Sequence, residues 1–176
     1  MKKKIIVRGP VLSQSGYGEQ ARFALRALKT RDDLDIYVQA IRWGNTGWIW
    51  EKTEERDWLD EQITKTVHHT RNGGKFDMSL QITIPNEWEK LAPINVGYTA
   101  GIETTKVAPQ WLVKGNDMNH IVVVSKHSKD VYEKTQAIAK NEQTGEEVDY
   151  NLKTSVTAVN YAVRDRTNKK PIDGFN

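Results

Sequence analysis

The chain has 176 residues, of which 38% are hydrophobic and 28% are charged, a composition typical of a folded globular domain. It contains no cysteine, which excludes disulfide bonds, thiolate nucleophiles and cysteine zinc sites. No apolar run approaches the ~20 residues that a membrane-spanning helix requires, and the apolar stretch after the first lysines is too short for a signal peptide. We therefore expect a cytoplasmic protein without an integral membrane segment.

The net charge of +3 is mild, and much of the positive excess lies in Lys2-Lys3-Lys4 and in the stretch 164–170. A nucleic-acid-binding face would interleave basic and aromatic residues on one element, and the sequence does not show this pattern. We interpret the basic ends as solvated and expect no nucleic-acid partner.

Short apolar runs alternate with amphipathic segments along the chain. The run Ile5-Ile6-Val7 predicts a buried strand, and the spacing of Ala21, Leu25 and Leu28 predicts a helix after it. In chain order we expect strand 3–8, helix 18–30, strand 34–41, helix 51–67 with Trp58, Ile63 and Val67 buried, strand 76–84, strand 94–99, strand 121–125, helix 128–140, a loop or exposed hairpin over 141–151, and strand 155–161.

This alternation predicts right-handed crossovers and a Rossmann-like, three-layer α/β/α sandwich with a mainly parallel sheet. In such folds ligands bind at the carboxyl ends of the strands, near a change in strand order. Candidate site residues are therefore expected in the segments that follow strands, at 9–18, 42–50, 85–88, 98–105 and 125–128.

The loop over 9–18 precedes the first helix, where backbone N–H groups can hold a phosphate. It contains Gly16 and Gly18, and Ser15 is the expected N-cap of the helix. It lacks the G-x-x-x-x-G-K-[ST] sequence of a P-loop and does not carry the full G-x-G-x-x-G dinucleotide fingerprint. The glycines alone are consistent with either a ligand loop or a tight turn.

A second polar group, Tyr98, Thr99 and Glu103, follows the strand at 94–99. A carboxylate there could orient a hydroxyl-rich substrate or stabilise developing positive charge. The alternative is that Glu103 caps the helix that contains Pro109.

The remaining candidates have strong structural alternatives. The junction Ser125-Lys126-His127-Ser128 is explained as well by an N-cap as by ligand binding. His68 and His69 are adjacent and therefore point to different faces, so we expect no metal site. The tryptophans of the segment 42–50 could stack on a sugar ring or pack over the sheet edge. No G-x-S-x-G sequence is present, which argues against a hydrolase nucleophile.

Three segments, in order along the chain, resemble the N-terminal domain of glycosyltransferase family 4 enzymes of the GT-B fold. They are GPVLSQSGYGEQARFALRAL, GYTAGIETTKVAPQWLVKGNDMNHIVVVSKHSKDVYEK and SVTAVNYAVRD. The resemblance spans most of the chain from 5 to 165, but no motif covers 42–75. It implies a Rossmann-like glycosyltransferase domain over 1–165, equivalent to half of a GT-B fold, and a basic tail or the start of an interdomain linker over 166–176.

The same resemblance implies roles for particular residues. In this family the N-terminal domain mainly holds the acceptor, and the C-terminal domain binds the nucleotide-sugar donor. The implied catalytic residue is Glu103, and no metal or cofactor is expected beside the nucleotide-sugar co-substrate. The implied donor phosphate loop comprises Gly16, Tyr17 and Gly18, and the implied substrate-binding residues are Ser15, Arg22, Tyr98, Thr99, Ser125 and Lys126.

The implied function is retaining transfer of a sugar from a nucleotide-sugar to a glycan or other hydroxyl acceptor. The family's phosphate-binding Lys or Arg and its E-x7-E donor motif have no counterpart in this sequence. We therefore expect transfer to require a C-terminal donor-binding domain or a separate subunit. Two alternatives remain: a non-catalytic sugar- or partner-binding module on a Rossmann scaffold, and an oxidoreductase, for which Gln39-Ala40-Ile41-Arg42 lacks the expected acid after the second strand.

Overall fold

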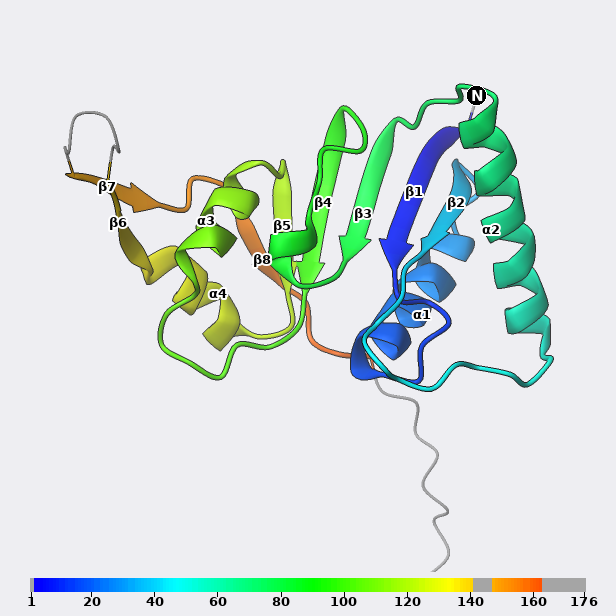
Figure 1. The fold of residues 1–176 in the computed structure, drawn as a ribbon, viewed down its shortest axis with the longest axis horizontal. Coiled ribbons are helices and arrows are strands. Elements are labelled where there is room, and N and C mark those ends of the chain that lie inside the picture. The colour runs from blue at the N-terminus through cyan, green and yellow to red at the C-terminus, as the bar shows by residue number, and fades with distance from the viewer. Residues whose placement is uncertain (1, 141–146, 163–176) are drawn as a thin grey trace, which may run out of the picture.

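The computed structural model describes residues 2–140 and 147–162, and these residues form an α/β domain built on a six-stranded sheet (Figure 1). Every pair of neighbouring strands in this sheet is parallel, in the order β2-β1-β3-β4-β5-β8. The predicted Rossmann-like fold class is confirmed. The strands are β1 (Lys3–Gly9), β2 (Leu34–Ala40), β3 (Met78–Ile82), β4 (Ile94–Thr99), β5 (His120–Val123) and β8 (Val156–Ala158).

Helices cover both faces of the sheet and complete the three layers. They are α1 (Gly16–Lys29), α2 (Glu54–Arg71), the short 3-10 helix η1 (Pro85–Glu87), α3 (Pro109–Asn116) and α4 (Lys126–Lys134). In Figure 1, α1 lies behind the sheet, whereas α3 and α4 lie in front of it. This placement follows from right-handed crossovers. The connection from β1 to β2 leads toward one edge of the sheet, whereas the later connections lead toward the other edge, so their helices lie on opposite faces.

Each face has its own hydrophobic core. On the α1 side, Ala21 and Leu25 of the helix pack in one cluster with Ile5 and Val7 of β1. On the opposite side, the second cluster contains Leu112 of α3, Val131 of α4 and the strand residues Ile121 and Val123. Because the strand order changes direction at β1, the expected binding crevice lies at the carboxyl ends of β1 and β3.

Helix α2 lies beside the outer strand β2, and two of its side chains pair with the free edge of that strand. The hydroxyl of Thr66 accepts a hydrogen bond from the Val38 amide at 2.7 Å, and Lys65 Nζ donates to the Ile36 carbonyl at 2.8 Å. These bonds satisfy backbone groups that an edge strand would otherwise leave unpaired. Val67 is 42% exposed, so its predicted burial is wrong, because α2 covers the edge of the sheet more than its face.

A loop containing η1 replaces a crossover helix between β3 and β4. Gln81 and Asn95 are buried beneath this loop and bind its backbone. The Gln81 carboxamide donates to the Glu89 carbonyl at 2.6 Å and accepts from the Glu89 amide at 2.9 Å. Asn95 Oδ1 accepts from the Leu91 amide at 2.9 Å and from the Ala92 amide at 3.1 Å. Buried polar side chains thus hold the loop against the sheet.

Most predicted elements are confirmed, but the helix expected over 128–140 is too long. Helix α4 ends at Lys134, and β6 (Gln136–Lys140) instead pairs antiparallel with β7 (Glu147–Asn151). The chain turns at Thr135, which is extended and buried, and Ala137 and Tyr150 then pack against the core. The expected loop or hairpin over 141–151 falls partly, and the tail or linker at 166–176 wholly, outside the described residues.

Candidate functional site

The segments predicted to carry function gather at the carboxyl edge of the sheet. The loop after β1 pairs with the tryptophan-containing segment after β2 through a bridge between Ser13 and Trp48. The Gln14 amide donates to the Gly47 carbonyl at 2.8 Å, and the Ile49 amide donates to the Leu12 carbonyl at 2.9 Å. The loop over 9–18 is therefore one side of a two-segment platform.

The two glycines of this loop have different structural roles. Ser15 is the N-cap of α1 and accepts a hydrogen bond from the Gly18 amide at 3.1 Å, as predicted. A Cβ at Gly18 would overlap the Ser13 carbonyl oxygen, so Gly18 lets the loop fold tightly over the helix start. A Cβ at Gly16 would meet no atom of the described residues within 4 Å. Gly16 is thus the glycine with open space beside its backbone.

Arg22 is buried under the same loop and acts as an internal brace. Its Nη1 donates to the carbonyls of Val11 and Ser13, each at 2.9 Å, and its Nη2 pairs with Glu19 at 2.7 Å. Because these contacts occupy the guanidinium inside the protein, Arg22 supports the loop from beneath. A direct role in binding substrate, which the resemblance implied, would require these bonds to be exchanged.

Tyr17 connects the glycine loop to the end of β4. Its hydroxyl is 3.0 Å from Thr99 Oγ1 and accepts a hydrogen bond from the Ala100 amide at 3.1 Å. Its ring packs against Trp43, with 4.6 Å between ring centroids. Burial raises the pKa of the Tyr17 hydroxyl, and the hydrogen bonds with Thr99 and Ala100 oppose part of this increase. Two segments that lie 82 residues apart in the sequence are thereby joined.

The three tryptophans of the segment 42–50 differ in exposure. Trp43 packs against Tyr17, which is the packing alternative, whereas Trp50 is 82% exposed and Trp48 is 41% exposed. An exposed indole offers a large apolar surface on which a sugar ring can stack. Packing explains Trp43, and Trp50 remains free to stack.

Tyr98 and Thr99 do not share a face of the sheet, although they are neighbours in β4. Successive side chains of a strand point to opposite faces. Thr99 faces Tyr17, whereas Tyr98 lines a small cavity of about 180 Å³ with Gln20, Phe23 and Tyr161 on the α1 side. Tyr98 therefore does not take part in the hydrogen-bonded contact between Tyr17 and Thr99.

In the segment after β5, Ser125 has the N-cap role that the sequence offered as the alternative to ligand binding. Ser125 is the N-cap of α4 and accepts a hydrogen bond from the Ser128 amide at 3.0 Å. Ser128 in turn accepts from the Ile102 amide at 3.2 Å, which ties the segment after β4 to this helix. Lys126 is exposed at the first position of α4. Ser125 is thus already engaged, while the Lys126 ammonium is accessible.

Glu103 lies in the exposed segment between β4 and α3. The alternative that it caps the next helix is wrong, because the N-cap of α3 is Ala108 and no side chain completes this cap. The hydrogen bonds and ion pairs found among the described residues include none to its carboxylate. Glu103 is therefore an accessible acid, but its immediate neighbours do not fix its orientation.

Glu87 is a second acid at this edge, and the sequence reasoning did not single it out. It ends η1, directly after β3, and its backbone carbonyl accepts a hydrogen bond from Arg8 Nη1. One of its carboxylate oxygens, Oε2, is buried without a hydrogen-bond partner among the described residues. A buried carboxylate oxygen without a donor is costly, and a ligand hydroxyl would relieve that cost. The sequence feature that could have indicated Glu87 is its position in the segment 85–88, which was expected to follow a strand and to contain candidate site residues.

The described residues contain no group of three or more His, Asp or Glu side chains placed to hold a metal ion. His69 is instead packed against Tyr37, with 4.6 Å between ring centroids, and its Nε2 lies 3.0 Å from the Lys75 carbonyl oxygen. Within the same residues, no helix combines the length and the apolar character needed to cross a membrane.

The fold and this edge define a Rossmann-like α/β domain with its candidate site at the carboxyl ends of parallel strands. Comparisons of the chain with protein-family models, with curated proteins and with solved structures gave no match. The function is therefore inferred from the residues at this edge and from their geometry.

Proposed function

We propose that this chain is the acceptor-binding half of a retaining glycosyltransferase of the GT-B type. It would act with a donor-binding domain or subunit that supplies the nucleotide-sugar. The acceptor would be a glycan or another molecule that presents a hydroxyl group. The proposal needs a crevice that is lined by hydroxyls and carboxylates and flanked by an exposed aromatic ring.

The observation that carries the proposal is the link from Tyr17 to Thr99 and Ala100. The two longest segments that resemble family 4 enzymes, around Gly16 and Glu103, are distant in the sequence. The link brings the ends of β1 and β4 together at the edge of the sheet where Rossmann-like folds bind ligands. A chance resemblance in two unrelated segments would not require them to be in contact.

The two acids suit different tasks in this proposal. Glu87, with its buried and unpaired carboxylate oxygen, would accept a hydrogen bond from an acceptor hydroxyl and fix its orientation. Glu103, on the exposed segment, would stabilise positive charge that develops on the transferred sugar in an oxocarbenium-like transition state. The open backbone at Gly16 leaves room for the donor phosphates to approach.

A non-catalytic sugar-binding module is the second candidate, and one observation favours it. The start of α1 is already satisfied by the Ser15 cap and is covered by the loop that packs on Gly18. A phosphate would thus meet the backbone mainly at Gly16. In this reading, Trp50 and Glu87 would hold a glycan without any transfer.

A transfer assay separates the two candidates. The chain is incubated with a panel of nucleotide-sugars and glycans, alone and with a GT-B donor-binding domain supplied by fusion or as a second subunit. Transfer that requires both parts and is lost in Glu87→Gln supports the proposal. Robust transfer by the chain alone would contradict it, and saturable glycan binding without donor effect would favour the binding module.

A further inference from the structure

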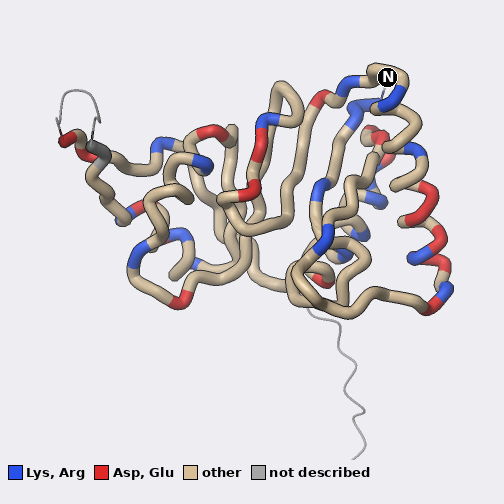
Figure 2. Tube along the Cα trace, viewed as in Figure 1, with Lys and Arg blue, Asp and Glu red and all other residues tan. Residues whose placement is uncertain are grey.

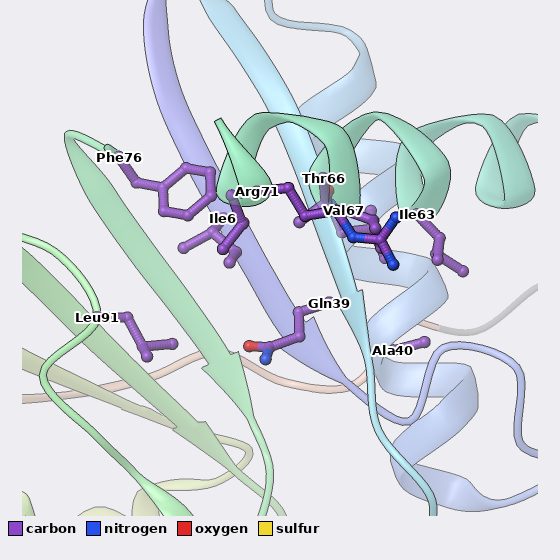
Figure 3. A pocket seen from close by; sticks show the side chains of 11 residues that line it. Ile6, Gln39, Ala40, Ile63, Thr66, Val67, Arg71, Phe76 and Leu91 are labelled. Carbon is purple, nitrogen blue, oxygen red and sulfur yellow. The ribbon is translucent and has the colours of Figure 1, made fainter. Parts of the chain in front are cut away.

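An apolar groove of about 400 Å³ lies on the face of the sheet opposite α1 (Figure 3). The groove forms between helix α2 and the loop that joins β3 to β4. Helix α2 is held at the edge of β2 by Thr66, and the loop between β3 and β4 is held over the inner strands by Gln81 and Asn95. No helix of the described residues covers the face of β1 between them.

The walls of the groove are apolar and come from three separate parts of the chain. In Figure 3, Phe76 and Leu91 lie on one side, and Ile63 projects from α2 on the other, with Ile6 of β1 between them. Phe76 and Leu91 also line an adjoining cavity of about 300 Å³. The two hollows share these two lining residues, and the volume of each falls in the size range of small-ligand sites, about 300–1,000 Å³.

The charges along the groove have one sign. Arg71 lines the first hollow and Lys75 lines the second, and no acidic residue of the described chain lines either. The hydrogen bonds and ion pairs found among the described residues include none to the Arg71 guanidinium. The nearest acid in sequence, Asp77, is already bound by the Lys4 amide at 2.7 Å. The apolar walls are therefore accompanied by two cations for which the described residues provide no ion pair. In Figure 2, both basic and acidic residues lie along α2.

We propose that this groove binds a soluble, single-chain anionic amphiphile, with the alkyl chain along Phe76 and Leu91 and the carboxylate at Arg71. Apolar walls bury the chain, and an Arg guanidinium is the side chain that best matches a carboxylate. The lining of the groove does not include Tyr17, Trp43, Thr99 or Ala100, so the proposal does not depend on the proposed glycosyl transfer.

Isothermal titration of the full chain with decanoate, below its micelle concentration, tests the proposal. We expect saturable binding by the wild-type chain and at least about tenfold weaker binding by Arg71→Gln, because a charge-assisted hydrogen bond is lost. Val67→Asp, at the mouth of the groove, should weaken binding as strongly. Val113→Asp is the matched control, because Val113 is 49% exposed on α3 and does not line the groove.

Three results would overturn the proposal. The first is no binding of decanoate by the folded wild-type chain. The second is a loss of discrimination. Either the uncharged decanol binds as tightly as decanoate, or Arg71→Gln and Val67→Asp bind decanoate as tightly as the wild type while circular dichroism confirms that the variants fold. The third is a wild-type dimer in sedimentation velocity that Val67→Asp dissociates, since a second copy would then occupy the groove.

Discussion

The hydroxyl of Tyr17 and the hydroxyl of Thr99 lie 3.0 Å apart and join the start of α1 to the end of β4. The Ala100 amide completes this junction by donating to the same tyrosine oxygen at 3.1 Å. One phenol group thus aligns the first loop of the chain with the segment that leads to Glu103. The geometry of the candidate site depends on this contact.

Replacing Tyr17 by phenylalanine should keep the ring packing against Trp43 and remove the junction. The Ala100 amide would lose its acceptor, which should lower the free energy of unfolding by about 1–3 kcal/mol. Urea unfolding measures this loss, and hydrogen exchange should show faster exchange at Ala100. Unchanged exchange at that amide would mean that the tyrosine does not hold the segment after β4.

The two glycines of the first loop offer a matched pair of substitutions. Gly18→Ala should lower the free energy of unfolding by about 1–3 kcal/mol, because its Cβ would overlap the Ser13 carbonyl oxygen. Gly16→Ala should leave stability unchanged or slightly higher, because its Cβ meets nothing within 4 Å and alanine favours the helix. Equal effects in thermal or urea unfolding would show that the loop does not pack on α1 as described.

The position of α2 beside β2 depends on Thr66. Thr66→Val keeps the shape of the side chain but leaves the buried Val38 amide without its acceptor. We expect a loss of about 1–3 kcal/mol in the free energy of unfolding, whereas Thr64→Val, at an exposed position of the same helix, should change it little. A similar small effect for both variants would contradict the edge-capping role.

Stability should fall at alkaline pH because of Tyr37. Burial, followed by the hydrogen bond to Asp35, raises the pKa of Tyr37 to about 12. Between pH ~10 and that value the folded chain retains a proton that the unfolded chain has lost, so stability is complete below pH ~10 and declines above it. The decline from this group should approach about 1.4 kcal/mol per pH unit.

Urea unfolding of the wild type and Tyr37→Phe between pH 8 and 11 measures this contribution. The free energy of unfolding of the wild type should fall relative to that of Tyr37→Phe as the pH rises above about 10. A constant difference over this range would mean that the Tyr37 hydroxyl titrates alike in the folded and unfolded chains.

The sequence predicts those features that depend on local patterns. The run Ile5-Ile6-Val7 and the spacing of Ala21 and Leu25 are sufficient for the first strand and helix, and the alternation of elements is sufficient for the parallel sheet. The N-cap role of Ser15 also follows from neighbouring residues, since its partner is the Gly18 amide. These features can be predicted because the residues that cause them are close together in the sequence.

The features that could not be predicted depend on distant contacts. The displacement of α2 to the sheet edge follows from the bond between Thr66 and Val38, which lie 28 residues apart. The end of α4 depends on the burial of Thr135 and on strand pairing beyond it. The importance of Glu87 appears only when its carboxylate oxygen is seen to be buried without a partner among the described residues.

The most direct test of the central claim is a residue-resolved NMR titration of the chain with a panel of glycans and nucleotide-sugars. The account predicts that an acceptor glycan shifts the amide resonances of Gly16, Tyr17, Thr99 and Ala100 in a saturable manner. Glu87→Gln should weaken this binding about tenfold or more. Saturable shifts confined to other surfaces, or no shifts with any member of the panel, would contradict the assignment of an acceptor site to the carboxyl ends of β1, β3 and β4.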